Sequence, residues 1–196
     1  RQFQLCSTNE AAIFEMAEQG LRIGKNPSAE LLAERQNLDG SIVLATMEGA
    51  RPLLVEIQAL VNPTNFGYPK RTASGFDLNR LNLLVAVLEK RTKLKLADKD
   101  IYVNVVGGLK LNDPAADLAV AMAIASASAG RSLDEGAVVF GEIGLGGEIR
   151  SATNWQARIK EAKKLGFTYA IAPKVHKDKF IKGVSDMRQA LIDYLQ

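Results

Sequence analysis

Basic and aromatic side chains on one segment give this sequence its clearest candidate chemistry. Lys70 and Arg71 follow a proline in a stretch rich in Pro, Gly, Asn and Ser, and Phe66 and Tyr68 lie just before them. A point charge, a guanidinium fork and aromatic surface together suit the phosphate groups of a nucleic acid. A loop whose charges serve only solubility has the same composition, so the residues alone leave both interpretations open.

Residues for enzymatic chemistry are sparse. A P-loop needs two glycines separated by four residues and followed by Lys and Ser or Thr, and the nearest stretch, 20–26, is one residue short and lacks the hydroxyl. The glycines of 141–147 precede no helix start, so we interpret them as a tight turn between two strands. His176, which a Ser-His-Asp triad would have to use, lies among lysines, which favours a solvated loop residue.

Metal and disulfide chemistry also find little support. Cys6 and His176 are the only residues of their types, which excludes an intramolecular disulfide and a zinc site built from several Cys and His ligands. Four aspartates could in principle hold Mg²⁺, but the sequence favours Asp113 as a helix cap and Asp117 as a first-turn partner of the helix dipole. The other two are Asp98 and Asp100. We therefore expect no metal site.

Composition indicates an ordinary globular domain with a polarised surface. The chain has 196 residues, 47% hydrophobic and 24% charged, with a net charge of +3. The net charge by segment is −3 over 1–69, +5 over 70–99, −4 over 100–155 and +5 over 156–196. No apolar run of about 20 residues and no signal segment is present, which predicts a soluble cytoplasmic protein. Because the chain begins with Arg1, we expect it to be part of a longer protein.

The apolar pattern predicts a mixture of helices and strands without strict alternation, which is typical of an α+β or α/β layered domain. The stretch 62–75 repeats with no structural period and is predicted to be a surface loop. The predicted elements, in chain order, are a hairpin over 11–23, a helix over 29–35 capped by Ser28, strands over 41–47 and 51–60, an amphipathic basic helix after Asp77, a strand over 100–106, a buried helix over 115–129, strands over 138–143 and 148–151, a helix over 154–165, a strand over 169–172 and a helix over 186–195.

Several motifs, in this order, resemble the C-terminal half of the bacterial DNA repair family RadA, also called Sms. They read Tyr-Pro-Lys-Arg at 68–71, Asp-Leu-Asn-Arg-Leu at 77–81, Leu-Glu-Lys-Arg at 88–91, Val-Val-Gly-Gly-Leu-Lys at 105–110 and Val-Phe-Gly-Glu-Ile-Gly-Leu-Gly-Gly-Glu-Ile-Arg at 139–150. The residues Ser-Thr-Asn-Glu at 7–10 and Phe-Glu-Met at 14–16 match the same family. The family's Lys-Asn-Arg-Phe-Gly signature is not matched at the start of this chain, where only Arg1 and Phe3 correspond to it.

The resemblance implies the fold of the Lon proteolytic domain, which is shared with the second domain of a small-subunit ribosomal protein, in a two-layer α/β arrangement. It implies that 1–40 form a hairpin and short helix leading from an ATPase core, and that 41–196 form the Lon-like domain. Where Lon has its nucleophilic serine this chain has Ala115, and where Lon has its lysine this chain has Gln156. A methyl group cannot attack a carbonyl, and a carboxamide cannot deprotonate a hydroxyl, so no peptidase is expected.

The resemblance further implies a hexamer scaffold and DNA-binding platform for an upstream RecA-like ATPase that acts in recombinational repair and branch migration. ATP, magnesium and zinc are then expected only upstream, no cofactor in this chain, and the recombinase RecA is a candidate partner besides DNA. The expected phosphate contacts are Lys70, Arg71, Arg80 and Arg150. Two alternatives stay open: a pure oligomerisation module, and a residual serine peptidase that uses another hydroxyl such as Ser126 or Ser128.

Overall fold

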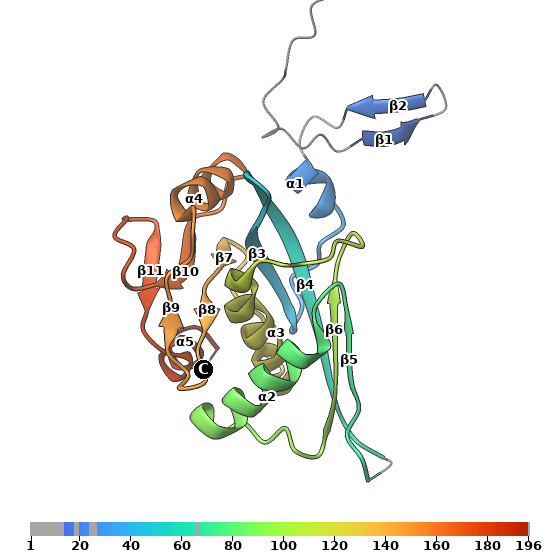
Figure 1. Cartoon of the computed structure of the whole chain (residues 1–196), viewed down its shortest axis with the longest axis vertical. Helices are drawn as coiled ribbons and strands as arrows, with labels where there is room; N and C mark the ends of the chain where they lie inside the picture. The colour runs from blue at the N-terminus through green and yellow to red at the C-terminus, as the bar shows by residue number, and fades with distance from the viewer. Residues whose placement is uncertain (1–13, 18–19, 24–26, 66, 196) are drawn as a thin grey trace, which may run out of the picture.

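The computed structural model describes residues 14–17, 20–23, 27–65 and 67–195 of the chain. Within them a seven-stranded sheet has the strand order β11-β10-β7-β3-β4-β6-β5 (Figure 1). The strands at its centre are β3 (Ser41–Glu48) and β4 (Arg51–Pro63), which are antiparallel, and most other neighbours are parallel. This mixed α/β architecture is consistent with the predicted α+β class. The remaining strands of the sheet are β5 (Arg71–Ser74), β6 (Lys99–Val105), β7 (Ala137–Val139), β10 (Tyr169–Pro173) and β11 (Ile181–Val184).

Outside the seven-stranded sheet, the described residues also form two short hairpins and the helices α1 and α4. β1 (Phe14–Ala17) pairs antiparallel with β2 (Gly20–Ile23), which confirms the predicted hairpin in the part of it that the structure describes. β8 (Glu142–Ile143) pairs with β9 (Ile149–Arg150). The helix α1 (Pro27–Leu31) contacts β4, and so does α4 (Trp155–Lys164).

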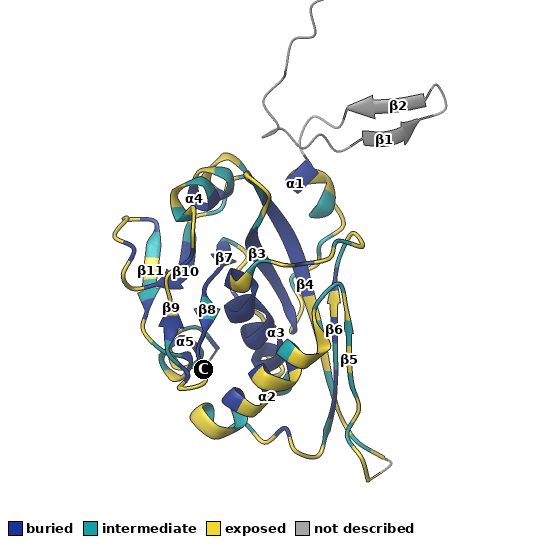
Figure 2. Cartoon of the chain, viewed as in Figure 1, coloured by how far each residue is buried: buried dark blue, intermediate teal, exposed yellow. Residues whose placement is uncertain are grey.

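Three helices, α2 (Leu78–Thr92), α3 (Asp117–Ala129) and α5 (Met187–Leu195), contact one another and lie on the same side of the sheet (Figure 1). The side chain of Asp77 caps α2 by accepting a hydrogen bond from the Arg80 amide, as expected. α3 is buried through Ser126, and Figure 2 shows it mostly dark blue. Its many alanines let neighbouring elements approach closely, so this helix forms the centre of the core.

The turn between β3 and β4 and the burial of β4 follow from the sequence pattern. Gly49 adopts a positive φ of 58° in the tight turn that joins the two strands. Residues 53–57 are all buried. Because successive side chains of a strand point to opposite faces, both faces of the sheet must be covered there. Farther along β4 the side chains of Gln58 and Leu60, which lie on the same face of the sheet, are exposed. No helix of the described residues covers that face at this end of β4, and we call it the outer face.

The structure corrects four predicted elements. The first helix begins at Pro27 and not at Ala29, and Ser28 is buried inside it, where its hydroxyl donates to Glu161 Oε1 at 3.1 Å and accepts from the Leu54 amide at 3.1 Å. The predicted 62–75 loop contains β5, and the lysine-rich stretch that includes His176, which was expected to be a loop, is followed directly by β11. The predicted strand over 138–143 is divided into β7 and β8: the Phe140 amide still bonds to Ile171 O of β10, but the Gly141 amide bonds to Ala115 O, outside the sheet.

No helix in the described part of the chain is long and apolar enough to cross a membrane. Within the same part, no group of three or more His, Cys, Asp or Glu side chains is arranged to hold a metal ion. Expectations for Cys6, Phe66 and the first thirteen residues fall outside the described residues.

Candidate functional site

Ala115, which the Lon resemblance assigned to the serine position, lies in a short 3₁₀ turn, η1 (Pro114–Ala116), directly before α3. Asp113 caps this turn, as predicted, by accepting a hydrogen bond from the Ala115 amide at 3.0 Å. Ala115 is buried, and its carbonyl accepts from the Gly141 amide at 2.8 Å. The backbone amide and carbonyl of Ala115 are therefore both engaged inside the protein.

Asp113 also holds together elements far apart in the sequence. Its Oδ2 accepts hydrogen bonds from the Thr46 hydroxyl at 3.0 Å, the Met47 amide at 3.1 Å and Arg158 Nη1 at 2.6 Å. Burial alone raises the pKa of a carboxyl group, but the hydrogen bond and charge of Arg158 and the two backbone amides outweigh it. The pKa of Asp113 is therefore below its ordinary value. Asp113 is charged at neutral pH and ties β3 and η1 to α4.

Arg158 is the residue that the sequence analysis missed. Its side chain is fully buried, donates to Ala45 O at 2.7 Å and to Thr153 O at 3.0 Å, and lies over the Phe140 ring at 5.7 Å. Its Nη2 has no hydrogen-bond partner among the described residues. Trp155, Arg158, Ile159 and Ala162 share one face of α4 by helical spacing, which is the sequence signal that could have revealed its burial.

The ion pair brings α4 against η1, the two elements that carry positions 156 and 115. Gln156 is exposed at the start of α4. Neither an alanine methyl nor a glutamine amide can serve as nucleophile or base, and an arginine does not lose its proton in proteins. Ser126, close to the C-terminal end of α3, is engaged as well, because its Oγ accepts from the Gly40 amide at 2.8 Å and donates to Arg131 O at 2.5 Å. This arrangement can position backbone but offers no acyl-transfer chemistry at these residues.

His176 is not the solvated loop residue that its lysine-rich surroundings indicated. The imidazole is buried, stacks on the Trp155 ring at a centroid distance of 5.0 Å and accepts a hydrogen bond at Nε2 from the Ala152 amide at 3.2 Å. The prediction failed because only the tertiary packing of Trp155, from α4, shelters this ring. Burial, and to a smaller degree the charge of Arg158, lowers the pKa of His176.

This lowered pKa predicts that acid destabilises the fold through His176. The unfolded chain takes up a proton at higher pH than the folded chain, so the stability that neutral His176 contributes is full above its ordinary pKa of 6.5 and is lost as pH falls below that value. We expect the free energy of unfolding, measured in urea, to fall between pH 7.5 and 5.5. His176 is the only histidine, so the variant His176→Gln should show a flatter profile. An equally steep profile in the variant would contradict this assignment.

The four predicted phosphate contacts lie in two places. Lys70 is exposed just before β5, and Arg71 opens that strand with its guanidinium donating to the backbone carbonyls of Lys99 and, at 3.0 Å, Leu96. Arg150 is the last residue of β9, and Arg80 contacts β8 of the same hairpin. Arg80 pairs with Asp117 and donates to Ile143 O at 2.8 Å, and the exposed Arg150 pairs with Glu148 at 2.6 Å. Asp117 is thus more than a helix-dipole partner, since it anchors α2 and β8 to α3.

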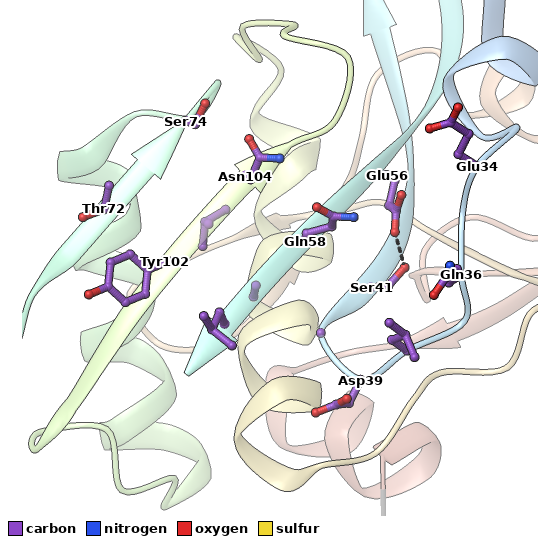
Figure 3. Close-up of a pocket in the computed structure, with 15 residues that line it drawn as sticks. Glu34, Gln36, Asp39, Ser41, Glu56, Gln58, Thr72, Ser74, Tyr102 and Asn104 are labelled. Carbon is purple, nitrogen blue, oxygen red and sulfur yellow. Dashed lines mark hydrogen bonds between the residues drawn. The ribbon is translucent and has the colours of Figure 1, made fainter. Parts of the chain in front are cut away.

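A polar groove on the outer face of the sheet is a second site that the sequence analysis missed. It has a volume of about 680 Å³ and lies between β4, β6 and β5 and the segment 34–41 (Figure 3). Glu56 accepts a hydrogen bond from the Ser41 hydroxyl at 2.6 Å inside it. Its other polar lining residues are Glu34, Gln36, Asp39, Gln58, Thr72, Ser74, Tyr102 and Asn104. No lysine or arginine lines it, so its chemistry suits cationic or neutral polar groups and not phosphates.

Comparisons with known proteins relate the chain to one group of relatives. It is 51% identical over 168 residues to the DNA repair protein RadA of Halalkalibacterium halodurans, which covers 85% of this chain and 37% of that protein. It is 47% identical over 193 residues to the DNA repair protein RadA of Bacillus subtilis, with 94% and 42% covered. For the protein of the same name from Streptococcus pyogenes serotype M1, the identity is 52% over 169 residues, with 86% and 37% covered.

The chain therefore spans about two fifths of the length of these relatives and is homologous to them over most of its own length. This confirms the resemblance to RadA that the motifs indicated. Residues 80–176 also match the family model described as subunit ChlI of Mg-chelatase. That match runs from Arg80 in α2 to His176 and so includes η1, α3 and α4, the elements around the Asp113–Arg158 ion pair.

Proposed function

Starting from its homology to DNA repair proteins named RadA, we propose that the chain is a protease-inactive, Lon-like domain of such a protein and serves it as a DNA-binding platform and hexamer scaffold. The observation that carries the proposal is the identity of 47% over 193 residues, nearly the whole chain. In this role the domain supports a RecA-like ATPase in the same protein, which acts in recombinational repair and branch migration. ATP, magnesium and zinc belong to other parts of that protein, and the chain acts in the cytoplasm, with RecA as a candidate partner.

The absence of peptidase activity is supported by the surroundings of Ala115. A serine protease needs a nucleophile, a base and backbone amides that point at the developing oxyanion. Here residue 115 has no hydroxyl, residue 156 has no amine, and the amide of Ala115 donates to the carboxylate of Asp113. That carboxylate is negatively charged and would repel an oxyanion. The same contacts make a structural junction out of the residues that the Lon resemblance assigns to catalysis.

The role in DNA binding is supported by charge and exposure. The two segments of net charge +5 supply the basic surface, and Lys70 is exposed at the end of an edge strand. Arg71 holds the backbone that presents Lys70, and Arg80 and Arg150 remain proposed contacts that share their guanidinium groups with Asp117 and Glu148. In the hexamer the basic segments face the DNA channel or its rim, and the acidic segments, which supply most of the lining of the polar groove, meet neighbouring subunits.

Replacing Lys70 by alanine is expected to weaken duplex DNA binding and to flatten its salt dependence. Each phosphate contact that is removed lowers the slope of log K against log salt by about 0.9, because one fewer counterion is released. The measurement is fluorescence anisotropy of a labelled duplex over a series of salt concentrations. Lys110→Ala is the matched control, since Lys110 is also exposed but lies in a segment of net negative charge.

An unchanged slope in the folded Lys70→Ala variant would remove Lys70 from the interface. The alternatives have their own signatures. A pure oligomerisation module, which the exposed Leu38 and Leu60 beside the polar groove favour, forms assemblies in light scattering and retains no DNA at moderate salt. A residual peptidase cleaves an unstructured protein without ATP.

A further inference from the structure

A second groove lies on the helical side of the molecule, where the ends of α2 and α3 meet α5 (Figure 1). Its volume is about 500 Å³. Apart from Thr92, its lining consists of apolar and basic residues, and no acidic side chain is among them. The apolar part includes Leu191, Ile192 and Leu195, and the basic part is Lys93, Arg131 and Arg188.

The floor of this groove is one face of α5. Arg188, Leu191, Ile192 and Leu195 follow the spacing i, i+3, i+4, i+7, so they lie along a single helix face. Leu195 is buried, whereas Ile192 is 43% exposed. The aliphatic face of α5 is therefore only partly covered by α2 and α3, and its uncovered part is accessible from solvent.

Three exposed cations surround this floor. Within the part of the chain that the structure describes, none of Lys93, Arg131 and Arg188 has an ion-pair partner within 4 Å. Lys93 directly follows the C-terminal end of α2, and Arg131 lies two residues after the end of α3; a helix dipole favours positive charge at such ends. Arg188 lies in the first turn of α5, where the dipole disfavours it. The helix dipoles thus stabilise the charges of Lys93 and Arg131 but not that of Arg188.

We propose that this groove binds a segment of a partner protein in which carboxylate side chains flank aliphatic ones. Such a segment places its aliphatic side chains on Leu191, Ile192 and Leu195 and its carboxylates beside the three cations, which matches both parts of the lining. DNA matches only the cations, because the groove offers no aromatic ring on which a base could stack. The proposal goes beyond the DNA-binding role, because it gives two cations of the basic segments, Lys93 and Arg188, a protein ligand in place of DNA.

The test is a selection of random 12-residue peptides on the immobilised chain, followed by anisotropy measurements on the enriched peptides. The enriched peptides should combine Asp or Glu with Leu, Ile or Val. Arg188→Glu and Ile192→Asn should each raise their Kd at least tenfold, and Lys110→Glu, an exposed control away from the groove, should leave it unchanged. Arg188 and Ile192 are exposed, so both variants should fold, which circular dichroism checks.

Three results would overturn the proposal. The first is that no peptide family is enriched above the bare support. The second is that the enriched peptides bind both groove variants with unchanged Kd. The third is that Arg188→Glu loses as much duplex DNA binding as peptide binding. The last result would assign the groove to DNA. Because the peptide measurements contain no DNA, a failure of the DNA-binding role leaves them unaffected.

Discussion

Arg158→Leu is expected to lower the free energy of unfolding by about 3–5 kcal/mol, the largest effect of any single substitution considered. The substitution removes the guanidinium and leaves the carboxylate of Asp113 charged in a buried site. It also leaves Ala45 O and Thr153 O without the donor that Arg158 provides. Leucine fills part of the volume but satisfies none of these acceptors, so α4 loses the polar contacts of Arg158 to β3 and to Asp113 together.

This effect is measured by urea unfolding that is monitored by circular dichroism, and two further variants serve for comparison. Lys160→Leu, at an exposed position of the same helix, should change stability by less than about 0.5 kcal/mol. The double variant Arg158→Leu with Asp113→Asn should be more stable than Arg158→Leu, because asparagine still offers an acceptor to Thr46, Met47 and Ala115 and avoids an isolated buried carboxylate. If the double variant is the less stable of the two, the ion pair is not what makes Arg158 important.

Asp117→Ala is expected to lower the free energy of unfolding by roughly 2–3 kcal/mol. Asp117 is almost fully buried, pairs with Arg80 through both carboxylate oxygens and accepts from the Ile143 amide at 3.1 Å. Without it that buried amide loses its acceptor, and α2 loses its link to α3. The cost is smaller than at Arg158, since the Arg80 side chain is 30% exposed and can turn to water.

The same urea titration checks this value, with Asp98→Ala as the matched control. Asp98 is an exposed aspartate whose contact with Lys99 is 3.7 Å long, so its loss should be within about 0.5 kcal/mol. A loss as small for Asp117→Ala would contradict the structural role of the Arg80–Asp117 pair. That result would strengthen Arg80 as a contact to DNA, because its guanidinium would then be dispensable to the fold.

The central elements of the fold were predictable from the apolar pattern. β3, β4 and α3 are long apolar runs and α2 has an apolar face of helical period, and their predicted bounds agree with the structure to within a few residues. β5 and β11 were missed because each is four residues long, lies at an edge of the sheet and carries lysine or polar residues. Their identity as strands comes from pairing with β6 and β10, which are remote in the sequence.

The candidate sites were less predictable, because their residues depend on tertiary contacts. Arg158 and His176 lie in basic segments, and charged or polar residues in such segments are usually exposed. The structure instead buries Arg158 against Asp113, which is 45 residues away, and His176 against Trp155. Asp113 was correctly predicted as a cap, but its three further contacts come from β3 and α4. The two grooves could not be predicted, since each combines elements from separate parts of the chain.

Binding of DNA by exposed cations is tested by titrating the unaltered chain into a labelled DNA duplex between about 50 and 300 mM salt. We expect log K to fall linearly with log salt, with a slope of about −0.9 for each phosphate neutralised and no dependence on the duplex sequence. No detectable binding at the lowest salt by a chain that circular dichroism shows to be folded, or a binding constant that does not change with salt, would contradict it.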